Sequence, residues 1–296
     1  MGKSRKTVAV IGGGAGGLCA AIAAAEAGAS AVIYEQSSRV GRKLLKTGNG
    51  RCNLTNTGAA LPHYHGGDVS FAGPALQAYP PERVLDFFRG LGLKTVEEYG
   101  GRVYPASDHA ASVLDVLRLA LEKPNVEVVT GAAVASVKNK NGKFTASWAE
   151  GSAEADALIV ACGGCAGSKL GGVTDGYTLL QSLGHSRTKL FPALVQLKTA
   201  SDLVRSLKGV RADGAVTLRR DGSILAQSAG EVQFTDYGVS GPAIFEVSRA
   251  ASMGGEGLTV HIDLLRDYSA ETVEKMLLAR CRNFSALTAE NLWTGL

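Results

Sequence analysis

Two compact apolar runs and one alanine-rich segment alternate over the first 35 residues of the chain. Residues 7–11 and 30–34 are rich in β-branched and other apolar side chains, as buried parallel strands are. Residues 18–27 contain no proline and consist mainly of alanine, which favours a helix, and Gly28 follows as a typical helix-terminating residue. The pattern predicts a strand–helix–strand unit with parallel strands.

The rest of the chain divides into two regions with different patterns. Up to about residue 190, apolar runs predict strands at residues 125–130, 133–137, 143–148 and 157–161, and a helix that ends at Leu183. From Phe191 onward, β-like runs alternate with turns, which predicts an antiparallel, barrel-like insertion. The strands expected there are residues 193–198, 215–219, 224–227, 231–235 and 258–263, with turns at residues 211–214 and 221–222. A helix is expected at residues 270–281 with Ser269 as its N-cap, and another is expected to begin within residues 288–292.

Glycines join the first predicted strand to the first predicted helix. Gly12, Gly14 and Gly17 form the pattern G-x-G-x-x-G, and Glu35 follows the second strand. In dinucleotide-binding units the first glycine permits a tight turn, the second lets the backbone approach a diphosphate, and the third lets the helix pack closely on the sheet. The helix N-terminus offers unpaired N–H groups to the phosphates, and an acid at the position of Glu35 binds ribose hydroxyls. We therefore predict a site for FAD or NAD, since the acid disfavours the 2′-phosphate of NADP.

Composition and charge exclude several other classes of protein. Of the 296 residues, 45% are hydrophobic and 20% are charged, as in ordinary globular proteins, which excludes a disordered or fibrous chain. The net charge of +4 is not gathered into a basic run, so we expect no nucleic-acid partner. No apolar stretch approaches the ~20 residues that span a bilayer, so no membrane association is expected. Five cysteines do not make a disulfide framework, and the expected location is cytoplasmic.

A second segment with features of a phosphate site follows at residues 39–56. Arg39, Arg42, Lys43 and Arg51 lie there among glycines and asparagines that favour turns. Exposed N–H groups and cations in such a loop suit a second approach to a diphosphate and to the edge of a flavin. A solvated loop is the alternative that composition alone leaves open.

The two glycine-rich segments together resemble those of a known flavoprotein family. Residues 8–28 read VAVIGGGAGGLCAAIAAAEAG, and residues 41–56 read GRKLLKTGNGRCNLTN. They are similar to the BaiN-type (YhiN-type) NAD(P)/FAD-dependent oxidoreductases, whose second motif reads GRKLL, a small-residue turn and GRCN-x-TN. Residues 101–108, GRVYPASD, and residues 233–243, QFTDYGVSGPA, are similar to further segments of that family.

This resemblance implies a fold, a domain arrangement and a set of cofactor contacts. It implies an α/β, Rossmann-like FAD-binding domain of the two-dinucleotide-binding type at residues 1–190. An inserted β-rich domain and the start of a helical segment would occupy residues 191–296. The implied FAD contacts are Gly12, Gly14, Gly17, Glu35, Lys43, Arg51, Cys52 and Asn53, with a backbone contact from Val134 to adenine, and Arg42 is added as a neighbouring cation.

The resemblance also sets an expectation for the C-terminal part of the FAD domain. In the family, the chain returns to that domain with a final strand and a glycine-rich motif that contacts the flavin and its phosphates. No equivalent motif occurs in these 296 residues. We therefore expect an FAD domain that lacks its closing segment, which a further segment or a partner chain would supply.

Cys162 and Cys165 form a C-x-x-C pair directly after the strand predicted at residues 157–161. Zinc needs about four ligands and the sequence offers no second such pairing, so no metal site is expected. A flavin-linked dithiol stays open, although activated dithiols usually lie at a helix start, where the helix dipole lowers the thiol pKa. In the resembled family this position reads A-T-G-G and passes close to FAD, which implies that Cys162 and Gly163 lie near the cofactor.

The function implied by the resemblance is that of a flavin-dependent oxidoreductase. NAD(P)H would reduce FAD, and the flavin would pass hydride to a small organic acceptor, with an activated C=C bond as a candidate. No residue pattern assigns a catalytic group; Tyr104, Tyr237, His185 and Cys162 are the candidates. Two alternatives remain: a fragmentary or non-catalytic flavin-binding protein, and an NAD-dependent dehydrogenase that uses the N-terminal unit alone.

Overall fold

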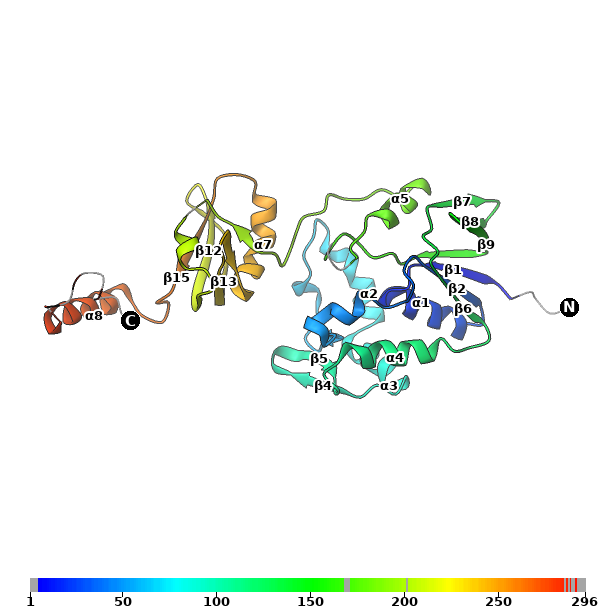
Figure 1. Cartoon of the computed structure of the whole chain (residues 1–296), viewed down its shortest axis with the longest axis horizontal. Coiled ribbons are helices and arrows are strands. Elements are labelled where there is room, and N and C mark those ends of the chain that lie inside the picture. The colour runs from blue at the N-terminus through cyan, green and yellow to red at the C-terminus, as the bar shows by residue number, and fades with distance from the viewer. Residues whose placement is uncertain are drawn as a thin grey trace. The chain divides into compact units, whose positions relative to one another are not determined.

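The computed structural model describes residues 5–167, 171–200 and 202–284, together with residues 286, 288 and 291. The chain forms two compact units, Met1–Arg187 and Thr188–Leu296, each of which is described by itself below (Figure 1). The boundary falls three residues before the one expected from the change in sequence pattern. The helix expected to begin within residues 288–292 lies largely outside the described residues.

A four-stranded parallel sheet forms the centre of the N-terminal unit. Its strands are β1 (Thr7–Ile11), β2 (Ser30–Glu35), β6 (Val126–Thr130) and β10 (Ala157–Val160), in the order β10-β1-β2-β6. Helix α1 (Ala15–Glu26) connects β1 to β2, so the predicted strand–helix–strand unit is confirmed. Because β10 and β2 both pair in parallel with β1, the carboxyl ends of these three strands lie next to one another at one edge of the sheet.

Alternate residues of β1 enter two different hydrophobic cores because successive side chains of a strand point to opposite faces. Val10 packs with α1 and with α4 (Ala110–Ala120), in a core that also contains Phe88 of α3 (Pro81–Gly90). Ile11 packs with the other core, which contains residues of α5 (Asp175–Ser182) and of an antiparallel meander. The meander strands are β7 (Ser136–Lys140), β8 (Lys143–Trp148) and β9 (Gly151–Ala155).

A small antiparallel sheet completes the N-terminal unit and borders the loop that follows β2. Its strands are β3 (Thr55–Asn56), β5 (Arg102–Pro105) and β4 (Thr95–Glu98), in that order. The short 3₁₀ segment η1 (Leu44–Gly50) precedes β3, and α4 contacts it. The intervening chain contains η2 (Leu61–His63), η3 (Val69–Ala72), α2 (Gly73–Ala78) and η4 (Tyr99–Gly101). None of the elements between β2 and β6 was predicted from the sequence, although α4 buries Ala110, Val113, Leu114 and Leu117 at helical spacing.

The C-terminal unit contains a five-stranded antiparallel sheet with helix α7 (Pro242–Gly254) packed against it. The strand order is β11 (Leu197–Lys198), β14 (Gly238–Ser240), β13 (Ser223–Phe234), β12 (Arg211–Arg220) and β15 (Leu258–Asp263). Short helix α6 (Leu203–Ser206) precedes β12, and α8 (Ala270–Asn283) follows β15. The predicted antiparallel β region is confirmed, and β11 and β15 are the open edges of the sheet within the described residues. Ser269 caps α8 as predicted, since its side chain accepts a hydrogen bond from the Thr272 N–H group at 3.1 Å.

Several predicted boundaries were wrong. The expected turn at residues 211–214 lies inside β12, and the expected strands at residues 224–227 and 231–235 belong to the single strand β13. The reason is that β12 and β13 form one long hairpin closed at residues 221–222. Gly214 and Gly230, which resemble turn residues in the sequence, pair with each other inside this hairpin. Of the strand expected at residues 193–198 only β11 is paired, and the strand expected at residues 133–137 begins at Ser136.

We predict that two neighbouring glycines of α1 respond differently to alanine. A Cβ atom at Gly17 would lie 1.8 Å from the Gly12 carbonyl oxygen, whereas a Cβ atom at Gly16 meets no atom within 4 Å. Gly17→Ala should lower the free energy of unfolding by about 2 kcal/mol, because backbone must move to relieve the contact. Gly16→Ala should leave it unchanged or raise it by up to about 1 kcal/mol, since alanine favours the helix. Urea unfolding of the FAD-free variants measures both, and an equal loss in the two would contradict this packing.

Candidate functional site

A cavity of about 1270 Å³ opens at the carboxyl ends of β1, β2 and β10. The ends of these three strands line it through Ile11, Tyr34 and Val160, and the residues that follow them line it as well. Ligands of parallel α/β sheets bind at this edge, and the volume exceeds the ~300–1,000 Å³ of a typical small-molecule pocket. The cavity is therefore large enough for a dinucleotide.

The glycine loop forms one wall of this cavity. Gly12 has φ +103° and a Cβ atom there would lie 2.7 Å from the Ala161 carbonyl oxygen, so glycine is needed both for the turn and for the approach of β10. Gly14 is the N-cap residue of α1 and has no side chain that could cap the helix. The first helical hydrogen bond runs from the Leu18 N–H group to the Gly14 carbonyl at 2.9 Å. The earlier N–H groups of α1 thus have no intrahelical acceptor, as at any helix start. This arrangement fits the phosphates of a dinucleotide.

Glu35 lies at the end of β2 and its carboxylate fixes the backbone of the glycine loop. One oxygen accepts a hydrogen bond from the Gly13 N–H group at 2.7 Å, and the other accepts one from the Ser37 N–H group at 2.8 Å. Glu35 also lines the cavity. A carboxylate has about four lone-pair positions, so these two bonds leave capacity to accept ribose hydroxyls.

Four cations of the loop after β2 line the cavity: Arg39, Arg42, Lys43 and Lys46. The Lys43 ammonium donates to the Ala166 carbonyl at 2.6 Å, and the Arg42 guanidinium donates to the Ser37 hydroxyl at 3.3 Å. The carboxylates in the lining are Glu35 and Asp175, so the lining carries two more positive than negative charges. This excess matches the charge of a diphosphate, and the residues present therefore fit FAD.

The structure brings most of the other predicted cofactor residues to the same cavity. Cys52, Asn53, Val134, Cys162 and Gly163 all line it. Gly17 and Arg51 are not among the lining residues. Gly17 packs closely on the Gly12 carbonyl, and the Arg51 guanidinium pairs with two carboxylates outside the cavity.

Further lining residues were not foreseen from the sequence. Thr178 and Leu179 come from α5, Ala132 and Ala133 precede Val134, and Phe88, Val113 and Leu117 supply an apolar part of the lining. Helix α5 is the next element along the chain after β10, and this order is the signal in the sequence that could have indicated that α5 lines the cavity.

Cys162 lies in the cavity with a protonated thiol. Burial raises the pKa of this thiol, and the nearby Asp175 carboxylate raises it further. The thiol donates to the Ile11 carbonyl at 3.6 Å. Cys165 is exposed, and both cysteines are free. A redox-active dithiol needs a lowered thiol pKa, so the environment of Cys162 does not favour that role.

Tyr104 and His185, the other catalytic candidates of the N-terminal unit, lie outside the lining. Tyr104 is buried in β5 beneath the Arg51 guanidinium, whose carbon lies 4.0 Å from the ring centroid. His185 is exposed after α5. Tyr237 is partly exposed and belongs to the C-terminal unit.

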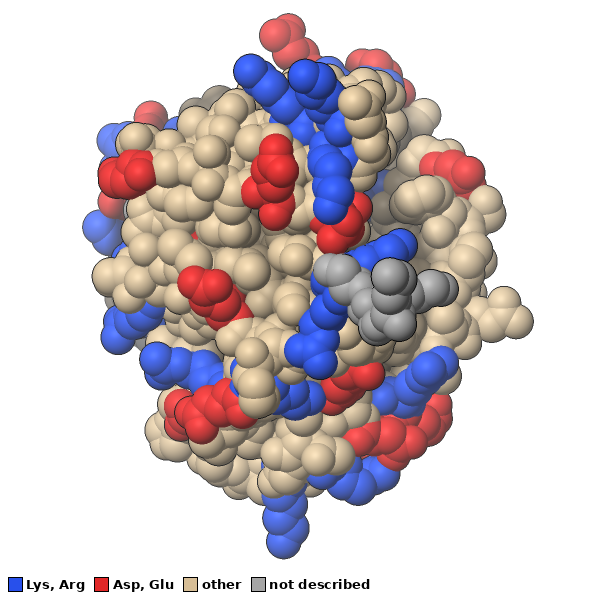
Figure 2. Space-filling model, turned by 90° about the vertical axis from the view of Figure 1, so that its right-hand side faces the viewer, with Lys and Arg blue, Asp and Glu red and all other residues tan. Residues whose placement is uncertain are grey.

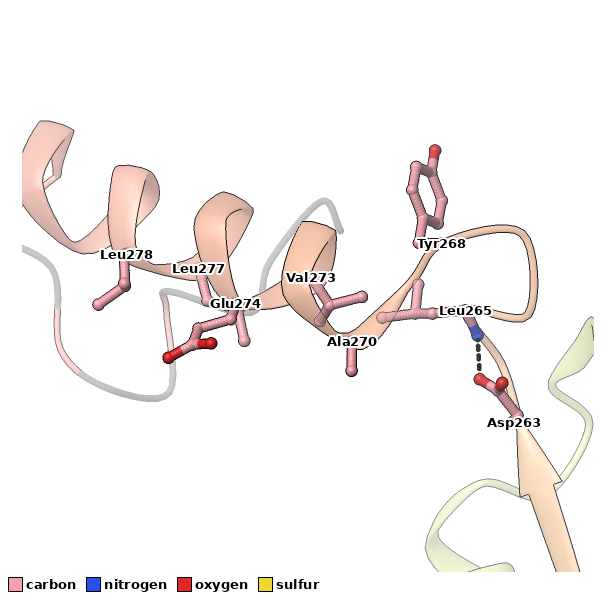
Figure 3. Close-up of a pocket in the computed structure, with 8 residues that line it drawn as sticks. All are labelled: Asp263, Leu265, Tyr268, Ala270, Val273, Glu274, Leu277 and Leu278. Carbon is pink, nitrogen blue, oxygen red and sulfur yellow. Dashed lines mark hydrogen bonds between the residues drawn. The ribbon is translucent and has the colours of Figure 1, made fainter.

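A second cavity, of about 500 Å³, lies in the C-terminal unit beside α8 (Figure 3). Its lining is largely apolar, and the Asp263 carboxylate accepts a hydrogen bond from the Leu265 N–H group at 2.9 Å. The lining residues are Asp263, Leu265, Tyr268, Ala270, Val273, Glu274, Leu277 and Leu278. It has neither a glycine loop nor a cation, so the cavity of the N-terminal unit is the candidate site.

The part of the chain that the structure describes has no metal-ligating cluster and no membrane-spanning helix. There, no cluster of three His, Cys, Asp or Glu side chains could hold a metal ion. No described helix has the length and apolar character to cross a membrane. On the face drawn in Figure 2, basic and acidic side chains are interspersed.

Comparison with known proteins assigns the family. The model of the HI0933-like protein Rossmann domain matches residues 6–260. The chain belongs to the HI0933-like Rossmann-domain family. A 3-dehydro-bile acid delta(4,6)-reductase of Clostridium scindens is 38% identical over 98% of this chain and 72% of its own length. These findings confirm the resemblance drawn from the glycine motifs, the Rossmann-like fold class and the class of flavin-dependent oxidoreductase.

More distant relatives are named for a different activity. Ribosomal RNA dihydrouridine synthases of Escherichia coli and Haemophilus influenzae are 28% and 25% identical over 89% and 88% of this chain. The chain spans 64% and 65% of their lengths, slightly less than two thirds.

Among solved structures, the open conformation of a flavocytochrome c3 fumarate reductase matches 71% of this chain and 47% of its own, with a TM-score of 0.45 and 16% identity. Thermovibrio ammonificans THI4 matches 69% of this chain and 71% of its own, with a TM-score of 0.39 and 14% identity. With TM-scores below 0.5, these matches add nothing to the family assignment.

We predict that Cys162 reacts slowly with iodoacetamide at neutral pH. Because the pKa of the Cys162 thiol is raised, little thiolate is present near pH 7. The alkylation rate of Cys162 should therefore keep rising with pH above the pH at which the rate of an ordinary thiol levels off. Exposed Cys165 should be alkylated at least about ten times faster at that pH. Peptide mass spectrometry follows both sites in one sample. Equal or faster modification of Cys162 would show an activated thiolate and restore the dithiol hypothesis.

Proposed function

We propose that this chain binds FAD in the cavity of the N-terminal unit and reduces a C=C bond conjugated to a carbonyl group, with NAD(P)H as the electron donor. The observation that carries this proposal is the convergence of the glycine loop, Glu35 and the four-cation loop on one cavity at the carboxyl edge of the sheet. A small-molecule substrate and a cytoplasmic location go with it.

The cavity residues divide among the parts of the cofactor. The N-terminus of α1, Arg42 and Lys43 would hold the diphosphate, and Glu35 would accept hydrogen bonds from the adenosine ribose. Val134 would contact the adenine. Cys52, Asn53, Cys162 and Gly163 would lie along the flavin. When bound, FAD supplies the hydride chemistry, and the protein binds, orients and excludes water.

The names of the relatives support the class of substrate. Saturation of a 3-oxo-delta(4,6) steroid and formation of dihydrouridine from uridine both remove a C=C bond that is conjugated to a carbonyl group. The bile-acid reductase is the more similar to this chain, at 38% against 28% identity. The apolar lining at Phe88, Val113 and Leu117 is also compatible with an apolar substrate. We therefore favour an unsaturated ketone over a nucleic acid.

Cys162 is the proton donor that we propose for this reaction. Reduction of a conjugated C=C bond adds hydride at one carbon and a proton at the other. Of the three catalytic candidates in the N-terminal unit, only Cys162 lines the cavity, and its raised pKa keeps the proton on Sγ at neutral pH. A group that holds its proton until the acceptor becomes basic acts as a general acid.

The proposed reaction is tested by an anaerobic titration of the purified 296-residue chain with added FAD. We expect the flavin absorption band to bleach with NADH or NADPH and to return when a conjugated steroid ketone is added. A chain that takes up no FAD would overturn the proposal. Bound flavin that no nicotinamide reduces would favour the non-catalytic alternative, and bound NAD without flavin would favour the dehydrogenase.

We predict that Gly14→Val separates cofactor binding from folding. A Cβ atom at Gly14 meets no protein atom within 4 Å, and its φ of −78° suits any residue. The free energy of unfolding of the FAD-free chain should change by less than about 0.5 kcal/mol. The FAD dissociation constant should rise at least about tenfold, because the new side chain occupies the space beside the diphosphate. Unchanged FAD affinity would show that the cofactor does not approach this glycine.

We predict that Cys162→Ala slows only the second half of the reaction. Reduction of the flavin by NAD(P)H should keep its rate, whereas reoxidation by the unsaturated ketone should slow by about 100-fold, the usual contribution of a general acid. Stopped-flow absorbance measures the two steps separately. Cys165→Ala is the matched control and should leave both rates unchanged. Equal reoxidation by the Cys162 variant would assign the proton to another donor.

A further inference from the structure

The loop that precedes β3 has an unusual backbone. Gly48, Asn49, Gly50 and Cys52 all have left-handed φ values, of 54°, 58°, 88° and 61°. Asn49 and Cys52 have side chains, for which this conformation costs free energy. A Cβ atom at Gly48 would lie 2.6 Å from the Asn53 N atom, so the turn is also closely packed. Such a conformation persists only when the surrounding structure holds it.

Arg51 lies in the middle of this loop and its guanidinium is held from three sides. It pairs with the carboxylates of Glu98, at the end of β4, and Asp108, which follows β5. The Arg51 Nη1 atom also donates to Glu98 Oε2 at 3.2 Å, so both Glu98 oxygens are engaged. The guanidinium carbon lies 4.0 Å from the centroid of the Tyr104 ring in β5. We call these four residues, Arg51, Glu98, Tyr104 and Asp108, the Arg51 clasp.

The clasp connects two parts of the chain that are distant in sequence. Glu98 and Asp108 lie 47 and 57 positions after Arg51. The backbone provides further links: the Leu54 N–H group donates to the Val103 carbonyl and the Thr57 N–H group donates to the Gly101 carbonyl, each at 2.8 Å, and β3 pairs with β5. The β4–β5 hairpin therefore holds the loop from its outer side.

Residues before and after Arg51 in the same loop line the cofactor cavity. Thr47, Cys52 and Asn53 line it, whereas none of the four clasp residues does. The Arg51 donors directed at the carboxylates are not available to a phosphate in this arrangement. We propose that Arg51 is a positioning residue, whose clasp on the β4–β5 hairpin holds Thr47, Cys52 and Asn53 in the conformation that receives FAD. This inference rests on the proposed function and replaces direct contact between Arg51 and the cofactor.

The strength of the clasp comes from its geometry. Isolated ion pairs on a surface contribute little, and the clasp carboxylates are partly exposed. Here one planar guanidinium pairs with both oxygens of Glu98, with a second carboxylate and with an aromatic ring. Lysine offers a single ammonium group in place of this fork, so the positive charge alone would not reproduce the clasp.

A double-mutant cycle on FAD affinity tests the proposal. We expect Arg51→Gln, Arg51→Lys and Glu98→Gln each to raise the FAD dissociation constant by about tenfold, and the Arg51→Gln/Glu98→Gln double variant to be no weaker than Arg51→Gln alone. The melting temperature of the FAD-free chain should change by less than about 2 °C, which separates positioning from general destabilisation. Arg89→Gln, which removes an exposed ion pair with Asp86 on α3, is the matched control and should bind FAD normally.

Direct contact with the diphosphate gives a different result. Arg51→Lys would then keep most of the affinity, Glu98→Gln would bind FAD as tightly as the unmodified chain or more tightly, and the two substitutions would act independently. Any of these outcomes overturns the positioning role.

Limited trypsin digestion of the FAD-free chain tests the clasp without the cofactor. Cleavage after Lys46, which precedes the left-handed turn, should be several-fold faster in Arg51→Gln and Glu98→Gln than in the unmodified chain. An unchanged cleavage rate would show that the clasp does not hold the loop. If the chain takes up no FAD at all, the proposed function fails. The digestion then still tests whether the Arg51 clasp holds the loop, because it does not require FAD.

Discussion

The contact between α1 and the turn that follows β1 is the constraint on which the rest of the N-terminal unit depends. A Cβ atom at Gly17 would overlap the Gly12 carbonyl, and one at Gly12 would overlap the Ala161 carbonyl, so the backbones of the helix, the turn and the residue after β10 approach closely. This approach directs the start of α1 at the carboxyl edge of the sheet. It also fixes the cavity there, because the ends of β1, β2 and β10 are adjacent in the parallel sheet.

Around that backbone contact, charged groups have two distinct tasks. Glu35 accepts hydrogen bonds from the Gly13 and Ser37 N–H groups, and so holds the turn while it faces the cavity. Arg42 and Lys43 supply charge to the cavity itself. Arg51 is a cation of the same segment, yet its charge is neutralised outside the cavity by Glu98 and Asp108. Cations that are neighbours in sequence thus act on opposite sides of one loop.

The sequence predicted the features that depend on local chemistry. The strand–helix–strand unit, the glycine turn and the Ser269 cap are each set within a few residues, and the pattern revealed them. It did not reveal features that depend on distant partners. Residues 211–214 resemble a turn but pair across a long hairpin with β13, and Arg51 resembles a phosphate ligand although its partners lie about fifty positions away.

The central claim is that the glycine loop, the end of β2 and the turn after β10 form one FAD site. Hydrogen–deuterium exchange of the purified chain with and without FAD tests this most directly. We expect FAD to slow exchange in the peptides that contain residues 12–17, in those that contain residues 35–37 and in those that contain residues 161–163, and to leave exchange in β12 and β13 unchanged. Protection that omits the glycine loop, or that appears only in the C-terminal unit, would contradict it.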